Sequence, residues 1–152
     1  MPSRERAAHA RRPRVSAVPT LVHPDTRFIA ADVGGTHTRV GLVRAGGSDE
    51  SHVVVLAHRK YVCADYPSLA AILADFIAGN SACAGIDRVA IASAGVVLDD
   101  AVINSNLPWR ISLSQLRSEL HLSVLQYIND FQAAAHAAQC MDPGDSLLLT
   151  PG

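Results

Sequence analysis

The sequence predicts an α/β fold in which a mixed β-sheet is flanked by helices. Short apolar runs of strand length alternate with segments whose apolar residues repeat at helical spacing. The predicted order is β-β-β-α-β-α-β-α, so an antiparallel meander is followed by alternating helices and strands. With 152 residues, of which 49% are hydrophobic and 18% charged, the chain has the length and composition of one globular domain.

Three strands open the predicted domain. Phe28–Ala31 is an apolar run that ends at Asp32 and is followed by Gly34-Gly35, which is typical of a buried strand entering a tight turn. The second strand, the next turn and the third strand are predicted at 39–43, 46–49 and 52–59.

The first helix is predicted to begin near Asp65-Tyr66-Pro67. Asp65 is a suitable N-cap, and proline is tolerated in the first turn of a helix. Gly79-Asn80 is expected to end this helix. Its apolar side chains repeat at helical spacing and are Leu69, Ile72, Leu73, Phe76 and Ile77.

The rest of the chain alternates strands and helices. Strands are predicted at 88–92 and 124–128, helices at 112–120 and 130–139, and the start of a further strand at 147–149. A small hairpin with strands 96–98 and 101–103 is expected around Asp99-Asp100. Residues 1–26, which hold five arginines and four prolines, are predicted to be a disordered basic leader before the domain at 27–152.

Composition excludes several classes of function. The net charge of −1 gives no reason to expect a nucleic-acid partner. Three widely spaced cysteines, with no C-x-x-C pair, suggest neither a zinc site nor a disulfide framework and suit the reducing cytoplasm. No apolar stretch reaches the length of a transmembrane helix, so no membrane partner is expected.

The first candidate site is a strand that ends in a carboxylate and enters a diglycine turn. Glycine permits positive φ and lets an anion approach bare backbone N–H groups. Asp32 repels phosphate unless a cation lies between them, so it implies Mg²⁺, held through water. A simple hairpin with a Gly-Gly turn explains the spacing equally well. The predicted nucleotide-binding residues are Ala31, Asp32, Val33, Gly34, Gly35 and Thr36.

The second candidate site is Asn129-Asp130, where an apolar strand meets a helix. In an α/β sheet, ligands collect at the carboxyl ends of strands, where Asp130 could orient a substrate hydroxyl and accept its proton. The alternative is that these residues only cap the helix, since Asn and Asp are favoured N-caps.

The third candidate site is the segment Asn104–Trp109. A neutral polyol must be held by groups that both donate and accept hydrogen bonds, and the side-chain amide of Asn106 does both. Trp109 is predicted to be a core anchor beneath this loop rather than a ligand.

Together these motifs resemble the bacterial glucokinase family, within the wider hexokinase–actin group. In that family a D-V-G-G-T turn binds ATP phosphates, which matches 32–36. An asparagine ahead of a tryptophan contacts glucose there, which matches Asn106. An I-N-D-F segment supplies a sugar-binding asparagine and the catalytic aspartate, which matches Asn129 and Asp130. The resemblance covers about residues 27–152 and implies the actin-like, ribonuclease H-like N-terminal domain of a sugar kinase.

The resemblance further implies ATP and Mg²⁺ as cofactors, glucose as the sugar, and a cytoplasmic enzyme of the first step of glycolysis, and it leaves a homodimer open. Family members carry a second domain that is expected to complete the site and is absent from this sequence. A non-catalytic sugar-binding remnant is therefore the alternative function. Mannose, glucosamine and other phosphoryl donors stay open. A sugar-responsive repressor is excluded because 26 irregular residues cannot form a helix-turn-helix ahead of the domain.

Overall fold

The computed structural model of the chain describes residues 26–45, 53–104 and 106–139. The predicted leader, the turn at 46–49 and the strand at 147–149 lie wholly or largely outside these residues. No helix in the described ranges is long and apolar enough to cross a membrane.

The centre of the fold is a five-stranded mixed sheet with the strand order β3-β2-β1-β4-β8. Strands β1, β2 and β3 form the predicted antiparallel meander, and β4 and β8 continue the sheet parallel to β1. The strands are β1 (Thr26–Val33), β2 (His37–Ala45), β3 (Val53–Val62), β4 (Arg88–Ser93) and β8 (Val124–Asn129). The predicted mixed α/β fold is confirmed.

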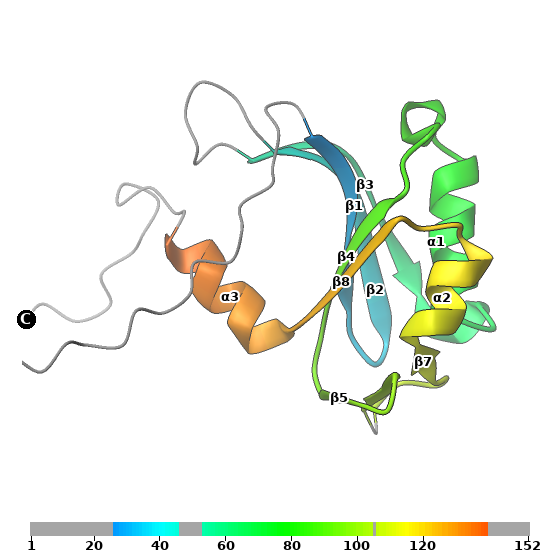
Figure 1. The fold of residues 1–152 in the computed structure, drawn as a ribbon, viewed down its shortest axis with the longest axis vertical. Coiled ribbons are helices and arrows are strands. Elements are labelled where there is room, and N and C mark those ends of the chain that lie inside the picture. Colours follow the sequence, from blue (N-terminus) through cyan, green and yellow to red (C-terminus); the bar gives the residue numbers. More distant parts are fainter. Residues whose placement is uncertain (1–25, 46–52, 105, 140–152) are drawn as a thin grey trace, which may run out of the picture.

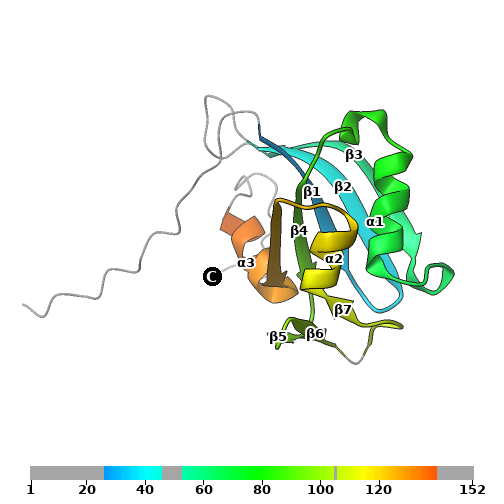
Figure 2. The same cartoon turned by 45° about the vertical axis from the view of Figure 1, so that its right-hand side comes forward.

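Helices lie on both sides of this sheet (Figures 1 and 2). α1 (Leu69–Ala78) and α2 (Leu113–Glu119) pack on one side, whereas α3 (Asp130–Gln139) lies on the opposite side, against β8 and β4. Two short 3-10 helices, η1 (Cys63–Asp65) and η2 (Ser81–Cys83), flank α1. Among the described helices, only α3 packs on that side.

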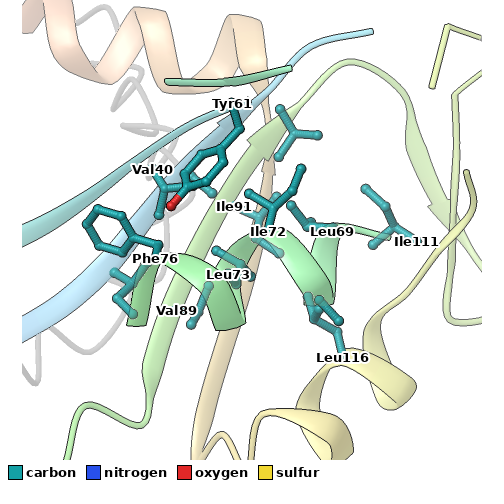
Figure 3. Close-up of a cluster of buried hydrophobic side chains, with 14 of the residues drawn as sticks. Val40, Tyr61, Leu69, Ile72, Leu73, Phe76, Val89, Ile91, Ile111 and Leu116 are labelled. Atoms are coloured by element: carbon teal, nitrogen blue, oxygen red, sulfur yellow. The ribbon is translucent and has the colours of Figure 1, made fainter. Parts of the chain in front are cut away.

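The hydrophobic core fills the space between the sheet and α1 (Figure 3). The buried residues of α1 recur at the spacing that the sequence predicted, so one side of the helix faces the sheet. Each such side chain contributes on the order of 1.5–3 kcal/mol when it leaves water. They meet alternate residues of the strands, and the largest fully buried side chains include Ile29, Val40, Leu42, Leu69, Ile72, Leu73, Val89 and Ile91.

The N-cap of α1 is Ser68, not Asp65. The Ser68 hydroxyl accepts the N–H of Ala71 at 3.1 Å, and Asp65 lies in η1, one turn before the helix. The prediction was wrong because β3 runs to Val62, past the predicted end at Arg59, so that η1 and a turn separate it from α1.

A three-stranded sheet of β5 (Val96–Leu98), β6 (Ala101–Ile103) and β7 (Ile111–Ser112) lies below the main sheet in Figure 1. The hairpin was predicted, and its turn residues Asp99 and Asp100 have φ of 47° and 70°. The Asp100 carboxylate accepts the N–H of Ser114 at 2.9 Å and so helps to cap α2. Hydrogen bonds from Ser114 and Ser112 lower the pKa of Asp100. Strand β7 was not predicted, because two residues carry no period.

Candidate functional site

The three parallel strands end at the same level of the sheet. Val33 of β1 is in register with Ser93 of β4, which is in register with Asn129 of β8. The diglycine turn of the first predicted segment (31–36) follows Val33 directly, and the second segment begins at Asn129. The carboxyl ends of parallel strands are where ligands bind in open α/β sheets. The register therefore brings the predicted phosphate turn and the Asn129-Asp130 pair to one edge.

The segment that follows β4 joins all three predicted site segments. The buried Ser93 hydroxyl donates to the carbonyl of Val33 at 2.9 Å. The Asn104 amide donates to the carbonyl of Ala94 at 2.8 Å, and the Asn129 amide donates to the carbonyl of Gly95 at 3.3 Å. The three bonds involve Val33, Asn104 and Asn129, and each of these residues belongs to a different predicted segment. Residues 93–95 therefore hold the three segments in fixed positions relative to one another.

The diglycine turn is closed by backbone hydrogen bonds. The N–H of Gly34 donates to the carbonyl of His37 at 3.0 Å, and the N–H of Cys63 donates to the carbonyl of Thr36 at 2.9 Å. The expectation that these glycines use positive φ is wrong, since neither has a φ in the left-handed region. Gly35 is glycine for another reason: a Cβ there would lie 2.5 Å from the carbonyl oxygen of Asn106. The predicted phosphate turn (31–36) and the predicted sugar-binding loop (104–109, the sugar loop) are thus in direct contact.

Asp32 lies opposite Arg39 of β2 in the antiparallel register, and the two side chains form an ion pair of 3.1 Å. Both are more than half exposed, so the pair adds little stability. Among the described residues, no group of three or more His, Cys, Asp or Glu side chains could hold a metal. A single carboxylate suits a cation that keeps its waters and takes substrate phosphates as ligands, as Mg²⁺ does. The predicted role of Asp32 therefore fits these surroundings.

Asn129 caps α3. Its side-chain oxygen accepts the N–H of Phe131 at 3.0 Å, and the Gln132 side chain accepts the N–H of Asn129 at 3.3 Å, which is a capping box. One carboxylate oxygen of Asp130 also accepts the N–H of Phe131, at 2.9 Å. Asn129 therefore has the helix-capping role that was the alternative interpretation of the Asn129-Asp130 pair. The second carboxylate oxygen of Asp130 has no hydrogen bond within the described residues.

Tyr127 supports the carboxyl edge of the sheet through a hydrogen bond to the end of β4. Its hydroxyl donates to the carbonyl of Ser93 at 2.9 Å. Burial raises the pKa of Tyr127, and the nearby Asp130 carboxylate raises it further. The hydroxyl therefore stays protonated and keeps its donor role at neutral pH.

Trp109 packs against the hydrophobic core, as predicted, and its indole N–H donates to the carbonyl of Cys63 at 3.3 Å. Asn106 is exposed in the same loop, where its backbone N–H is held by the Asn104 side chain at 2.9 Å. The loop thus presents an amide to solvent above an anchored tryptophan.

Several residues that build this edge were not foreseen from the sequence. Ser93 and Cys63 act through hydrogen bonds to residues 60 and 29 positions away, which no local pattern reports. Asn104 was inside a predicted segment but without a role. For Ser93 a weak signal existed, because it is the one polar residue at the end of an apolar strand.

Solved structures with this fold define its class as sugar kinases of the actin-like fold. A glucokinase from an Antarctic psychrotroph matches with a TM-score of 0.72 at 27% identity over 83% of this chain and 39% of that one. A ROK family glucokinase from Streptomyces griseus, solved with glucose and AMPPNP, matches with a TM-score of 0.58 at 25% identity, over 79% of this chain and 38% of that one.

The family follows from the sequence itself. The glucokinase family model matches residues 29–152, and the chain belongs to this family. A glucokinase-like protein of Xylella fastidiosa strain Temecula1 is 46% identical over 81% of this chain and 36% of its own length. The glucokinase of Paramagnetospirillum magneticum is 34% identical over 76% of this chain and 34% of its own length. The chain thus spans about a third of the curated relatives that it matches.

Proposed function

We propose that this chain forms the sugar- and phosphate-binding wall of a cytoplasmic kinase that transfers the γ-phosphoryl group of ATP to the 6-hydroxyl of glucose, the first step of glycolysis. One observation carries the proposal. The phosphate turn, the sugar loop and the Asn129-Asp130 pair meet at the carboxyl edge of three parallel strands that end in register. The names of the relatives and the glucose and AMPPNP of the Streptomyces griseus structure support the choice of substrates.

The turn at 31–36 is the proposed phosphate site. The Gly34 N–H is used within the turn, so the N–H of Gly35 is the proposed backbone donor to a ligand that binds where β1 ends, and Thr36 adds a hydroxyl. Asp32 would hold Mg²⁺ through water, and the cation would neutralise phosphate charge as the group moves. Arg39, paired with Asp32, lies close enough to contribute a second positive charge at this edge.

The sugar is held by Asn106 and Asn129, and Asp130 is the proposed catalytic residue. The amides donate to and accept from the sugar hydroxyls. Asp130 orients the attacking hydroxyl through its second carboxylate oxygen and accepts the proton late in the transfer. In this reaction class, positioning supplies most of the catalysis, so the fixed relation of the three segments matters as much as the base.

The test of Asp130 uses a completed chain, in which residues 1–152 are followed by the portion that comes after the matched segment in the Paramagnetospirillum magneticum glucokinase. Asp130→Asn is expected to lower kcat by about 10²–10⁴, the usual contribution of a positioned acid–base group. The KM for glucose should change less, because an amide still hydrogen-bonds the hydroxyl. Asp99→Asn, the same change in an exposed turn, is the control. A near-normal kcat in Asp130→Asn would mean that Asp130 has only a structural role at the start of α3.

Asn106→Ala in the completed chain should give the opposite pattern, since it removes a sugar ligand and leaves the base. The loss is expected mainly in the KM for glucose, measured with saturating ATP. An unchanged KM would mean that the sugar lies elsewhere.

A second candidate is a sugar-binding protein without turnover. It is favoured by one observation, that the 46% identical Xylella fastidiosa relative is called glucokinase-like rather than glucokinase. Calorimetric glucose binding to residues 1–152 with no phosphorylation would support this alternative.

A further inference from the structure

Cys63 holds the phosphate turn from below, although the sequence predicted no role for it. It is fully buried in η1, directly after β3. Its thiol donates to the carbonyl of Gly34 at 3.3 Å, and its N–H donates to the carbonyl of Thr36 at 2.9 Å. The Thr38 hydroxyl, also fully buried, lies 3.3 Å from the sulfur. Because the thiol proton is directed to Gly34, this hydroxyl is the donor to the sulfur.

The same residue also holds the sugar loop. The carbonyl of Cys63 accepts the indole N–H of Trp109 at 3.3 Å, and Trp109 lies three residues after Asn106. The loop meets the turn a second time where Gly35 lies against the backbone of Asn106. Turn and loop are therefore joined at two points, one of which is Cys63.

We propose that Cys63 is a positioning residue that fixes the phosphate turn relative to the sugar loop. The inference rests on the proposed function, because it concerns the alignment of the phosphoryl group with the sugar hydroxyl. Cys63 touches neither substrate and acts through Gly34, Thr36 and Trp109. A displacement of about 1 Å between reacting groups can cost about 10²-fold in rate, so a modest loosening of this link has a measurable effect.

The kinetic test compares four variants of the completed chain. Cys63→Ala removes both side-chain hydrogen bonds and should lower kcat and raise the KM for ATP, with a combined loss in kcat/KM of about tenfold. Cys63→Ser keeps a donor and an acceptor and should recover most of it. Trp109→Phe keeps the ring but loses the bond to Cys63, and should raise the KM for glucose. Cys83→Ala is the matched control, because Cys83 is similarly buried but lies in η2, which follows α1, whereas Cys63 lies in η1 before it.

A second measurement needs no turnover and uses residues 1–152 alone. Trp109 is the only tryptophan of the chain, so its quenching by acrylamide reports on the sugar loop. Cys63→Ala should raise the quenching constant above that of the parent chain, whereas Cys83→Ala should not. If Cys63→Ala matches Cys83→Ala in both quenching and kinetics, the inference is wrong. If the quenching differs as expected but the completed parent chain phosphorylates no sugar, the link is present and the proposed function is what fails.

Discussion

Gly35 shows how a single residue can be required by a neighbour rather than by its own backbone conformation. The sequence predicted glycine there for positive φ and for space beside a phosphate. The structure gives the close approach of the Asn106 carbonyl instead. A side chain at position 35 would therefore displace the sugar loop as well as the phosphate turn.

Gly35→Ala in the completed chain is expected to raise the KM for both ATP and glucose, each by about tenfold or more, because one methyl group moves two binding segments. Gly41→Ala, where a Cβ would meet the Ala57 carbonyl at an ordinary 3.4 Å, should leave both constants near those of the parent. Initial rates at varied ATP and varied glucose measure both effects. A rise confined to the KM for ATP would show that the loop yields and that only the phosphate turn is affected.

The residues proposed to carry chemistry are easier to pick out in the sequence than the residues that hold them in place. Asn106, Asn129 and Asp130 stand in short motifs next to strand ends, so their residue types and spacing are visible in the sequence. Ser93 and Cys63 are ordinary small residues whose partners are far away along the chain. Their part in the site depends on which strands are neighbours, and sequence pattern alone does not give the strand order.

Among the elements, those with a clear period or a turn signal were predicted, whereas the shortest strand was not. The four-residue repeat of apolar side chains located α1 within a few residues, because burial of one helical face produces that pattern. Its cap was misplaced, since Asp65 and Ser68 are both good N-caps and only the end of β3 decides between them. Strand β7 has two residues and no pattern to read.

Strand β3 carries a buried tyrosine, Tyr61, from which we predict how the unfolding free energy depends on pH. Burial, with a smaller effect of the neighbouring Asp75 carboxylate, raises the pKa of Tyr61 to about 12. Because the folded-state pKa is raised, this contribution to stability is complete below the unfolded pKa near 10 and is lost as the pH rises through 12. The chain should lose about 2 kcal/mol of unfolding free energy between pH 9 and pH 12 through this group.

Urea unfolding of the parent chain and of Tyr61→Phe at pH 9 and pH 12 measures this loss. Phenylalanine fills the same space and does not ionise, so the variant should lack the contribution while the other titrating groups act equally in both proteins. Parallel losses in the two proteins would show that Tyr61 ionises as easily in the folded chain as in the unfolded one.

At the scale of the whole molecule, the described helices α1 and α2 cover one side of the sheet, and of the described helices only α3 packs on the other. Beside α3, a hollow of about 700 Å³ is floored by small residues of three strands, Ala30, Gly41, Ala90 and Ala92. Val55 lies at its rim and is 58% exposed. Open apolar surfaces of this kind favour association. Residues 1–152 should therefore self-associate at micromolar concentration.

Val55→Asp should shift residues 1–152 toward the monomer in sedimentation velocity, because it places a charge at the rim of the hollow. Leu98→Asp is the control, since Leu98 is similarly exposed, at 60%, but lies on β5, away from the hollow. A parent chain that is monomeric throughout, or equal effects of the two variants, would contradict this prediction.

The chain on its own is expected to phosphorylate glucose very slowly or not at all. Phosphoryl transfer requires the γ-phosphate, Mg²⁺ and the attacking hydroxyl to be held in line, and such positioning supplies about 7–11 kcal/mol of the barrier. The described residues provide one wall of the proposed arrangement, on the edge formed by β1, β4 and β8. Closure around the substrates excludes water from the reaction, and it needs a second protein surface opposite this edge. A coupled assay on purified, monodisperse residues 1–152 measures this, with the completed chain as the positive control. Turnover of about 1 s⁻¹ or faster, which is within the ordinary range for enzymes, would show that a second copy of the chain or another of its segments completes the active centre.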